Sequence, residues 1–148
     1  MNKYLVVIIS GLLLGCGNEN EERVEQNLRE IILEKQTAWE ATGINSYTFT
    51  YSETPNDCPT AQPFPPVEIQ VVEGKITSLY IPSQGSYLEP SERVFPTIDR
   101  VFINMKQQVD TLQGTPEFDN TLHFPVKYSV EKSAAPCDGH IISISSFI

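Results

Sequence analysis

The sequence predicts an α+β fold, in which a single domain holds an antiparallel sheet of about five strands with two helices on one face. Two segments, 22–42 and 97–112, carry apolar residues at the three- and four-residue spacing of a helix. The segments between and after them alternate apolar and polar residues with the period of a half-buried strand. The expected order is therefore helix, three strands, helix, two strands.

The first helix is expected over residues 22–42. Gly43 suits the position just past a helix end, where a left-handed backbone is common, and Ile44 would then pack on Trp39. This contact gives the only tryptophan a structural role rather than a ligand-stacking one. The expected core-facing stripe consists of Val24, Leu28, Ile31, Ile32, Ala38 and Trp39.

The first strand is expected over residues 46–52, where Tyr47, Phe49 and Tyr51 share one face. We interpret this aromatic face as core rather than as a ligand-binding surface. Residues 54–66 contain five prolines and should form a loop that links two strands.

A hairpin is expected from residues 67–72 and 76–81. The Glu73–Gly74 pair between them predicts a tight turn, which we expect to be a type I turn with Gly74 as the bulge residue. The polar segment that follows, residues 82–95, is expected to be a loop.

The second helix should begin after Thr97, which is a good N-cap, with Asp99 in the favourable first turn. Gly114 and Pro116 are expected to end it. Its predicted apolar face consists of Ile98, Val101, Phe102, Met105, Val109 and Leu112.

Two strands should close the fold, over residues 122–131 and 140–148. Pro125 within the first of them suggests an edge strand, or a backbone position that faces away from the hydrogen-bond ladder.

The N-terminus resembles the signal peptide of a bacterial lipoprotein. Lys3 precedes an apolar stretch, residues 5–14, that is too short to span a bilayer as a helix. The stretch ends in Leu13-Leu14-Gly15-Cys16, which is similar to a lipobox, although Leu14 is bulkier than the usual residue there. The resemblance implies cleavage before Cys16 and acylation of that cysteine, with palmitate-like chains that together anchor the protein stably in a membrane.

The resemblance also implies the domain organisation and the location. Residues 1–15 would be a cleaved signal peptide, 16–22 a lipidated tether and 23–148 a single α+β domain. The protein would be exported and held on a membrane through the lipid on Cys16. Because Gly17 rather than Asp follows the cysteine, the expected location is the outer membrane facing the periplasm, if the cell has two membranes.

The two other cysteines, Cys58 and Cys137, are expected to form a disulfide. An exported protein lies in a compartment that permits disulfides, and lipidation of Cys16 accounts for the odd cysteine. The alternative is two separate thiols. The spacing does not fit a redox-active pair.

Composition and motifs exclude several functions. A formal charge of −9 argues against nucleic-acid binding, which requires a basic surface. The sequence lacks phosphate-loop, zinc-protease and nucleophile-elbow motifs, so we predict no enzyme activity, no cofactor and no metal. A metal site from Asp138, His123 and His140, or a triad from one of the many serines, could be assembled only by choice, and both histidines are expected at the surface.

Several segments together resemble a family of small bacterial lipoproteins that is known only as a domain of unknown function. The match covers most of residues 36–148 and brings no activity with it. A second cysteine near Cys58 and a glycine before Pro125 are missing from the pattern, and the first departure favours pairing of Cys58 with Cys137. The matching segments are Trp39, the strand 47–51, Cys58, the hairpin 67–76, the helix start 97–102, residues 124–128, and Asp138-Gly139.

The expected function is therefore that of a lipid-anchored, non-enzymatic module of the cell envelope, which binds another envelope protein or a small envelope ligand. Two alternatives remain from the sequence: an assembly factor or inhibitor, and a hydrolase of envelope polymers without a recognisable motif. A cleft lined by convergent carboxylates or a histidine would favour the hydrolase. The sequence leaves the oligomeric state open.

Overall fold

The computed structural model describes residues 19–56, 58, 60–90 and 94–148, with side chains from residue 22 onward. The predicted signal peptide, Cys16 and the first part of the tether lie outside the described residues. Within the described part, no helix combines the length and the apolar character needed to cross a membrane.

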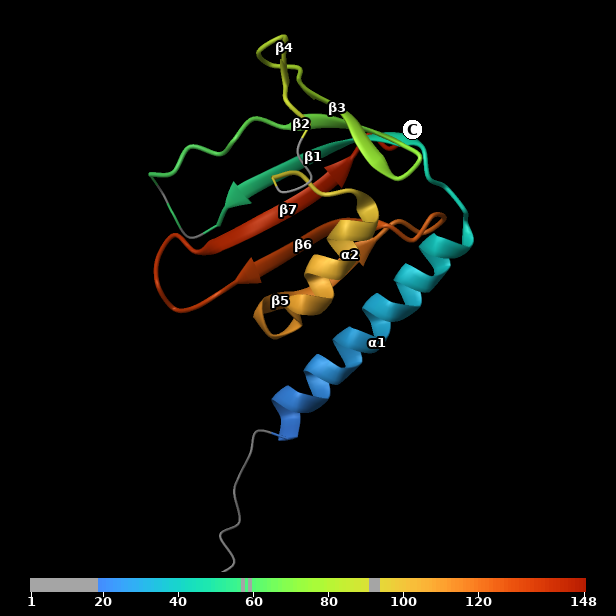
Figure 1. The fold of residues 1–148 in the computed structure, drawn as a ribbon. Coiled ribbons are helices and arrows are strands. Elements are labelled where there is room, and N and C mark those ends of the chain that lie inside the picture. The colour runs from blue at the N-terminus through green and yellow to red at the C-terminus, as the bar shows by residue number, and fades with distance from the viewer. Residues whose placement is uncertain (1–18, 57, 59, 91–93) are drawn as a thin grey trace, which may run out of the picture.

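The structure is built on an antiparallel sheet of seven strands in the spatial order β4-β3-β2-β1-β7-β6-β5 (Figure 1). Strand β1 lies at its centre, between β2 and β7, so the two halves of the sheet meet along it. The strands are β1 (Tyr47–Pro55), β2 (Val67–Val72), β3 (Lys75–Ile81), β4 (Ser86–Leu88), β5 (Leu112–Phe118), β6 (Pro125–Glu131) and β7 (Gly139–Ser145).

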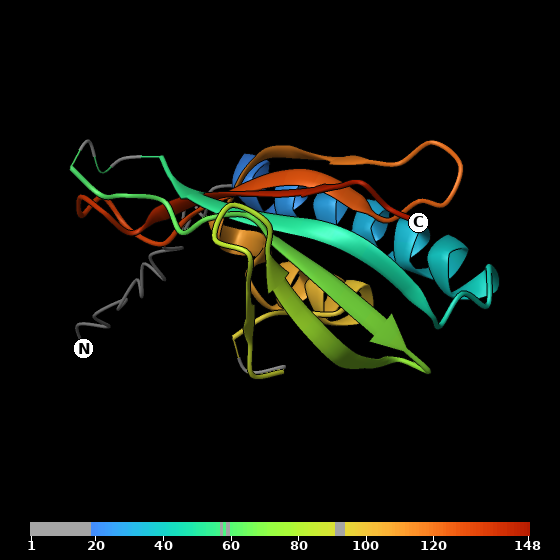
Figure 2. The same ribbon diagram turned by 90° about the horizontal axis from the view of Figure 1, so that it is seen from above.

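Two α-helices, α1 (Glu19–Ala41) and α2 (Ile98–Gln107), lie on the same side of the sheet (Figures 1 and 2). Thr97 caps α2 through its side chain, which accepts a hydrogen bond from the Arg100 amide. The first turns of α1 extend beyond the sheet (Figure 1), and its buried residues begin only at Leu28. Gly43, with a φ of +67°, follows the end of α1.

The fold prediction was wrong in the number and the order of the strands. The sheet has seven strands rather than five, because β4 and β5 form its two edges. Strand β4 has only three residues and lies in the segment predicted to be a polar loop. Such a short edge strand carries too few residues to show an alternating pattern.

The prediction of the second helix was wrong at its end. Helix α2 ends at Gln107, a 3₁₀ turn spans Val109–Thr111, and β5 begins at Leu112. Val109 and Leu112 are buried in the 3₁₀ turn and at the start of β5, as they would be in a longer helix. Their apolar spacing therefore does not distinguish the two structures. Gly114 and Pro116 lie inside β5, where the register with β6 shifts, and an edge strand tolerates both residues at such an irregularity.

The turn between β2 and β3 also differs from the prediction. Glu73 and Gly74 both have a positive φ, 51° and 75°, which matches a two-residue type I′ turn rather than a type I turn with a bulge. The turn is held against the start of β1, since the Glu73 amide donates to Ser46 Oγ and the Gly74 amide to Asn45 O.

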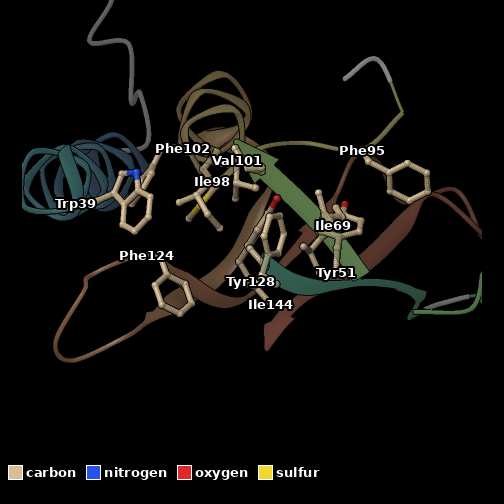
Figure 3. Close-up of a cluster of buried hydrophobic side chains, with 14 of the residues drawn as sticks. Trp39, Tyr51, Ile69, Phe95, Ile98, Val101, Phe102, Phe124, Tyr128 and Ile144 are labelled. Atoms are coloured by element: carbon tan, nitrogen blue, oxygen red, sulfur yellow. The ribbon is translucent and has the colours of Figure 1, made fainter. Parts of the chain in front are cut away.

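The hydrophobic core lies between the sheet and α2, with α1 beside it. Ile98, Val101 and Phe102 of α2 face inward-pointing residues such as Ile69 and Ile144 (Figure 3). Trp39 and Phe124 lie at one end of this cluster, and Tyr51 and Phe95 lie at the other (Figure 3). All buried apolar residues of the described part fall between positions 28 and 144, so the core that the structure describes lies within residues 19–148.

The predicted disulfide between Cys58 and Cys137 is confirmed. It joins the proline-rich loop after β1 to the turn before β7. Because Pro55 pairs with His140 across these two strands, the disulfide closes the sheet at the same end as Tyr51 and Phe95.

Candidate functional site

The core-facing residues of three neighbouring strands change from apolar to ionisable at the disulfide end of the sheet. On β1 the inward series that contains Phe49 and Tyr51 continues to Glu53. Lys132 follows β6 in phase with Tyr128 and Val130, and His140 precedes Ile142 and Ile144 on β7. The strand registers place these positions beside one another, because Glu53 pairs with Ile142, and His140 pairs with Val130.

Helix α2 and the segment before it form the walls above these strand ends. Arg100, Asn104 and Gln108 are four residues apart, so they form one stripe along the helix. Phe95 and Pro96, which precede the helix, also line this space. Together these elements enclose a cavity of about 480 Å³, which we call the polar chamber. Its described lining residues are Tyr51, Glu53, Val94, Phe95, Pro96, Arg100, Asn104, Gln108, Tyr128, Val130, Lys132, His140 and Ile142.

Glu53 has two close neighbours inside the polar chamber. His140 Nδ1 lies 3.2 Å from Glu53 Oε1, and the Tyr51 hydroxyl donates to Glu53 Oε2 at 3.2 Å. One carboxylate oxygen therefore accepts a hydrogen bond, while His140 Nδ1 lies beside the other without forming one. The side chains remain partly accessible, at 26% for His140 and 45% for Glu53.

The two tyrosines of the polar chamber stay protonated over the physiological range. Burial raises the pKa of Tyr51 well above its ordinary value, and the neighbouring Glu53 carboxylate raises it further. Burial followed by the charge of Glu53 raises the pKa of Tyr128 in the same way. Their hydroxyl groups are therefore neutral and able to donate hydrogen bonds.

Two cations border the chamber. Within the described part of the chain, the guanidinium group of Arg100 takes part in no ion pair. The second cation, Lys132, lies near Asp138, whose pKa is lowered mainly by the hydrogen bond from Ser133 Oγ and to a smaller extent by the charge of Lys132. The chamber thus presents positive charge, although the whole chain carries a net charge of −9.

A second cavity, of about 300 Å³, adjoins the first and shares four lining residues with it, among them Tyr51 and Phe95. We call it the apolar chamber. The Phe95 ring packs between Tyr51, at a centroid distance of 6.2 Å, and Phe64, at 6.1 Å. Its described lining residues are Tyr51, Glu53, Phe64, Pro65, Val67, Leu88, Val94 and Phe95.

Each of the two cavities is large enough to hold a small molecule. Ligand sites in proteins usually have volumes of about 300–1,000 Å³ and combine apolar walls with a few convergent polar groups. Here the apolar walls and the polar groups lie in adjoining chambers, so the pocket that they form has two chemically different ends. The Glu53–His140 pair at the polar end could also hold or move a proton.

The two histidines, from which the sequence analysis predicted no site, lie in different regions of the structure. His140 lies inside the polar chamber rather than at the surface, and His123 lies in the turn before β6, at the opposite end of that strand. Among the described residues, no group of three or more histidine, cysteine or acidic side chains is arranged to hold a metal ion. Asp138, His123 and His140 therefore do not form a metal site.

Sequence reasoning missed the pocket, although a signal for it was present. Tyr51 was interpreted as core, and it is both core and chamber wall. The useful signal was the phase of the alternation, because an ionisable residue that follows two buried residues in phase must point toward the covered face of the sheet. Phe64 and Pro65 of the proline-rich loop, expected only to link two strands, line the apolar chamber.

The chain matches a known protein family. A model described as a family of unknown function, DUF6174, matches residues 32–147. The chain belongs to the DUF6174 family. The expected membership in an uncharacterised family is confirmed, and the DUF6174 match includes every described residue that lines the pocket. No curated protein and no solved structure matches the chain.

Proposed function

We propose that this protein is a lipid-anchored module of the cell envelope whose domain binds a small molecule. The observation that carries the binding role is the pocket with its polar and apolar chambers. Of the two kinds of partner that the sequence left open, an envelope protein and a small envelope ligand, the pocket favours the small ligand, since the volumes of its chambers lie in the range of small-molecule sites.

The anchor in this proposal rests on the pattern of residues 1–16. A short basic start, an apolar stretch of signal-peptide length and a cysteine after Gly15 are the features that support it. In a cell with two membranes, the proposal places the domain in the periplasm, on the outer membrane. The polar turns at the start of α1 would then separate the domain from the lipid.

The binding role can be tested with a substitution that fills the polar chamber. Asn104→Trp would place a large ring in the chamber, whereas Gln107→Trp puts the same ring on an exposed position of the same helix. The full-length protein and both variants are purified from its own cells and extracted with organic solvent for mass spectrometry. We expect a small molecule that accompanies the unchanged protein and the Gln107 variant but not the Asn104 variant. Identical extracts from all three proteins would contradict the binding role.

The anchor can be tested by fractionation of cells. Cys16→Ser removes the only thiol that could carry the lipid, so the protein should leave the membrane fraction and lose the mass of the acyl chains. Retention of an unchanged mass and an unchanged membrane association in this variant would contradict lipidation.

A second candidate function, hydrolysis of an envelope polymer, is favoured by the Glu53–His140 pair, which could serve as a general base. Purified envelope polymer incubated with the protein gives the test. Release of soluble fragments that His140→Asn abolishes would establish hydrolysis, and no release by the unchanged protein would exclude it for that polymer.

A further inference from the structure

We infer that the ligand of this pocket is a single-chain amphiphile with an oxyanion head group, bound with its head in the polar chamber and its chain in the apolar chamber. This inference rests on the proposed binding function and adds the chemical class of the ligand. It follows from the charges of the polar chamber, from the character of the adjoining apolar chamber and from the residues that separate the two.

The head group should be anionic because the chamber has unmatched positive charge. Glu53 is the only carboxylate among the described lining residues, against the two cations Arg100 and Lys132, and one of its oxygens already accepts a hydrogen bond from Tyr51. Arg100 has no ion-pair partner in the described part of the chain. A guanidinium group matches the geometry of a carboxylate or phosphate with two parallel hydrogen bonds.

Neutral donors complete a suitable environment for an oxyanion. The Tyr128 hydroxyl stays protonated, and the amide groups of Asn104 and Gln108 lie on the same helical stripe as Arg100. These groups can donate hydrogen bonds to oxygen atoms that a single cation leaves unsatisfied. A cationic head group would instead meet two cations, Arg100 and Lys132, and only one carboxylate, Glu53.

The chain should be apolar because the adjoining chamber offers few polar partners. Phe64, Val67, Leu88 and Phe95 surround it, and Glu53 is its only described charged lining residue, at the border with the polar chamber. Tyr51 and Phe95 line both chambers, so they lie where the two chambers adjoin. An alkyl chain that extends from an anionic head fits this order of surfaces.

The charge of the ligand is tested by isothermal titration calorimetry on residues 19–148 with three octyl amphiphiles below their micelle concentrations. These are octyl phosphate, octyltrimethylammonium and octyl glucoside, which are anionic, cationic and neutral. We expect octyl phosphate to bind at least tenfold more tightly than the other two. Equal or tighter binding of either of them, or no binding of octyl phosphate, would overturn the inference.

Arg100→Gln tests the head-group contact. It should weaken octyl phosphate binding at least tenfold, while the exposed Lys75→Gln should leave it unchanged. Arg100 is itself exposed, so the variant should keep its thermal midpoint. A folded Arg100 variant with unchanged affinity would overturn the proposed head-group site.

The chain contact is tested with butyl, hexyl and octyl phosphate. Each methylene that enters the apolar chamber should tighten binding about fourfold. Phe64→Ser should reduce this dependence, whereas Val72→Ser, at another exposed apolar position, should not. Affinities independent of chain length would overturn the assignment of the apolar chamber.

The experiments distinguish an error in the ligand class from an error in the proposed binding function. If octyltrimethylammonium binds and Asn104→Trp abolishes its binding, the pocket binds small molecules and only the ligand class is wrong. If none of the three amphiphiles binds, the ligand class is overturned, and the extraction experiment decides the binding function independently.

Discussion

The two ends of the helix-covered sheet face use polar groups in opposite ways. At the Trp39 end, the indole Nε1 donates to Asp99 Oδ1 at 2.9 Å, and the Ile98 amide donates to the buried Tyr47 hydroxyl at 3.0 Å. At the disulfide end, Arg100 borders an open chamber without an ion-pair partner in the described part of the chain. Asp99 and Arg100 are adjacent in sequence, so the first turn of α2 contributes one side chain to each end.

The aromatic residues differ between the two ends as well. Trp39 lies edge-on to Tyr47, Phe124 and Phe147, at centroid distances of 5.6, 6.3 and 5.7 Å, which leaves the tryptophan 1% exposed. Phe64, by contrast, is 51% exposed at the rim of the apolar chamber. The comparison indicates that side-chain packing stabilises the fold at the Trp39 end, whereas the side chains that line the pocket at the disulfide end are available for binding and the covalent cross-link holds that end together. Substitutions at the two ends should therefore have different consequences.

Removal of the disulfide should have the largest effect on stability, because this bond cross-links the loop after β1 to the turn before β7. Cys58→Ser combined with Cys137→Ser removes a cross-link over a separation of 79 residues. In the chain-entropy model, the loss of free energy of unfolding is about 4–5 kcal/mol. Urea unfolding of residues 19–148 measures it. A loss of less than about 1 kcal/mol would show that the disulfide is not needed to hold this end together.

Trp39→Phe should have the next largest effect. The substitution removes the hydrogen bond to the Asp99 carboxylate and part of the aromatic packing, so we expect a loss of about 2–3 kcal/mol. A double-mutant cycle with Asp99→Ala isolates the hydrogen bond, and its coupling energy should be about 1 kcal/mol or more. Additive effects would contradict a direct interaction. Ligand binding should be unchanged in Trp39→Phe as long as the protein is folded.

Tyr47→Phe should lower the free energy of unfolding by about 1 kcal/mol at neutral pH, because it removes the acceptor of the Ile98 amide. The exposed Tyr87→Phe serves as the control at neutral pH. Unfolding curves at neutral pH that cannot be told apart for the Tyr47 variant and the unchanged protein would contradict the role of this hydroxyl.

The same variant changes the response to alkaline pH. Burial raises the pKa of Tyr47 from 10.0 to about 12. A pKa that is higher in the folded state means that the stability is fully present below pH 10 and is lost as the pH rises from 10 toward 12. The slope for one such group is about 1.4 kcal/mol per pH unit. Tyr47→Phe should reduce the decline in this range, and an unaltered decline would contradict the assignment.

Glu53→Gln should have the smallest effect on stability. The contact with His140 is partly exposed, and even exposed ion pairs contribute little, so we expect a change within about 1 kcal/mol. Thermal unfolding at neutral pH measures it. A loss comparable to that of Trp39→Phe would show that the pocket-lining side chains stabilise the fold as much as the packing around Trp39, and would contradict the comparison.

The sequence predicted the Trp39 end better than the disulfide end, for physical reasons. Regular alternation at Tyr47 and Phe49, and helical spacing in α2, report burial directly, because burial of apolar surface is what the pattern records. The edge strand β4 is short and the edge strand β5 is irregular. Gly114 and Pro116 in β5 are residues typical of a helix end or a loop. The pocket depends on the pairing of distant strands, which brings Glu53, Lys132 and His140 together, and no local pattern records that pairing.

The central claim is that the disulfide end binds an anionic amphiphile while the Trp39 end does not. Nuclear magnetic resonance of residues 19–148, titrated with octyl phosphate, tests both parts in one experiment. We predict shifts for the amides of Tyr51, Arg100, Tyr128 and His140, with the Trp39 indole signal unchanged. Shifts centred on the Trp39 indole, or on Thr50 and Ser143 of the uncovered sheet face, would contradict the claim, as would a spectrum that does not change.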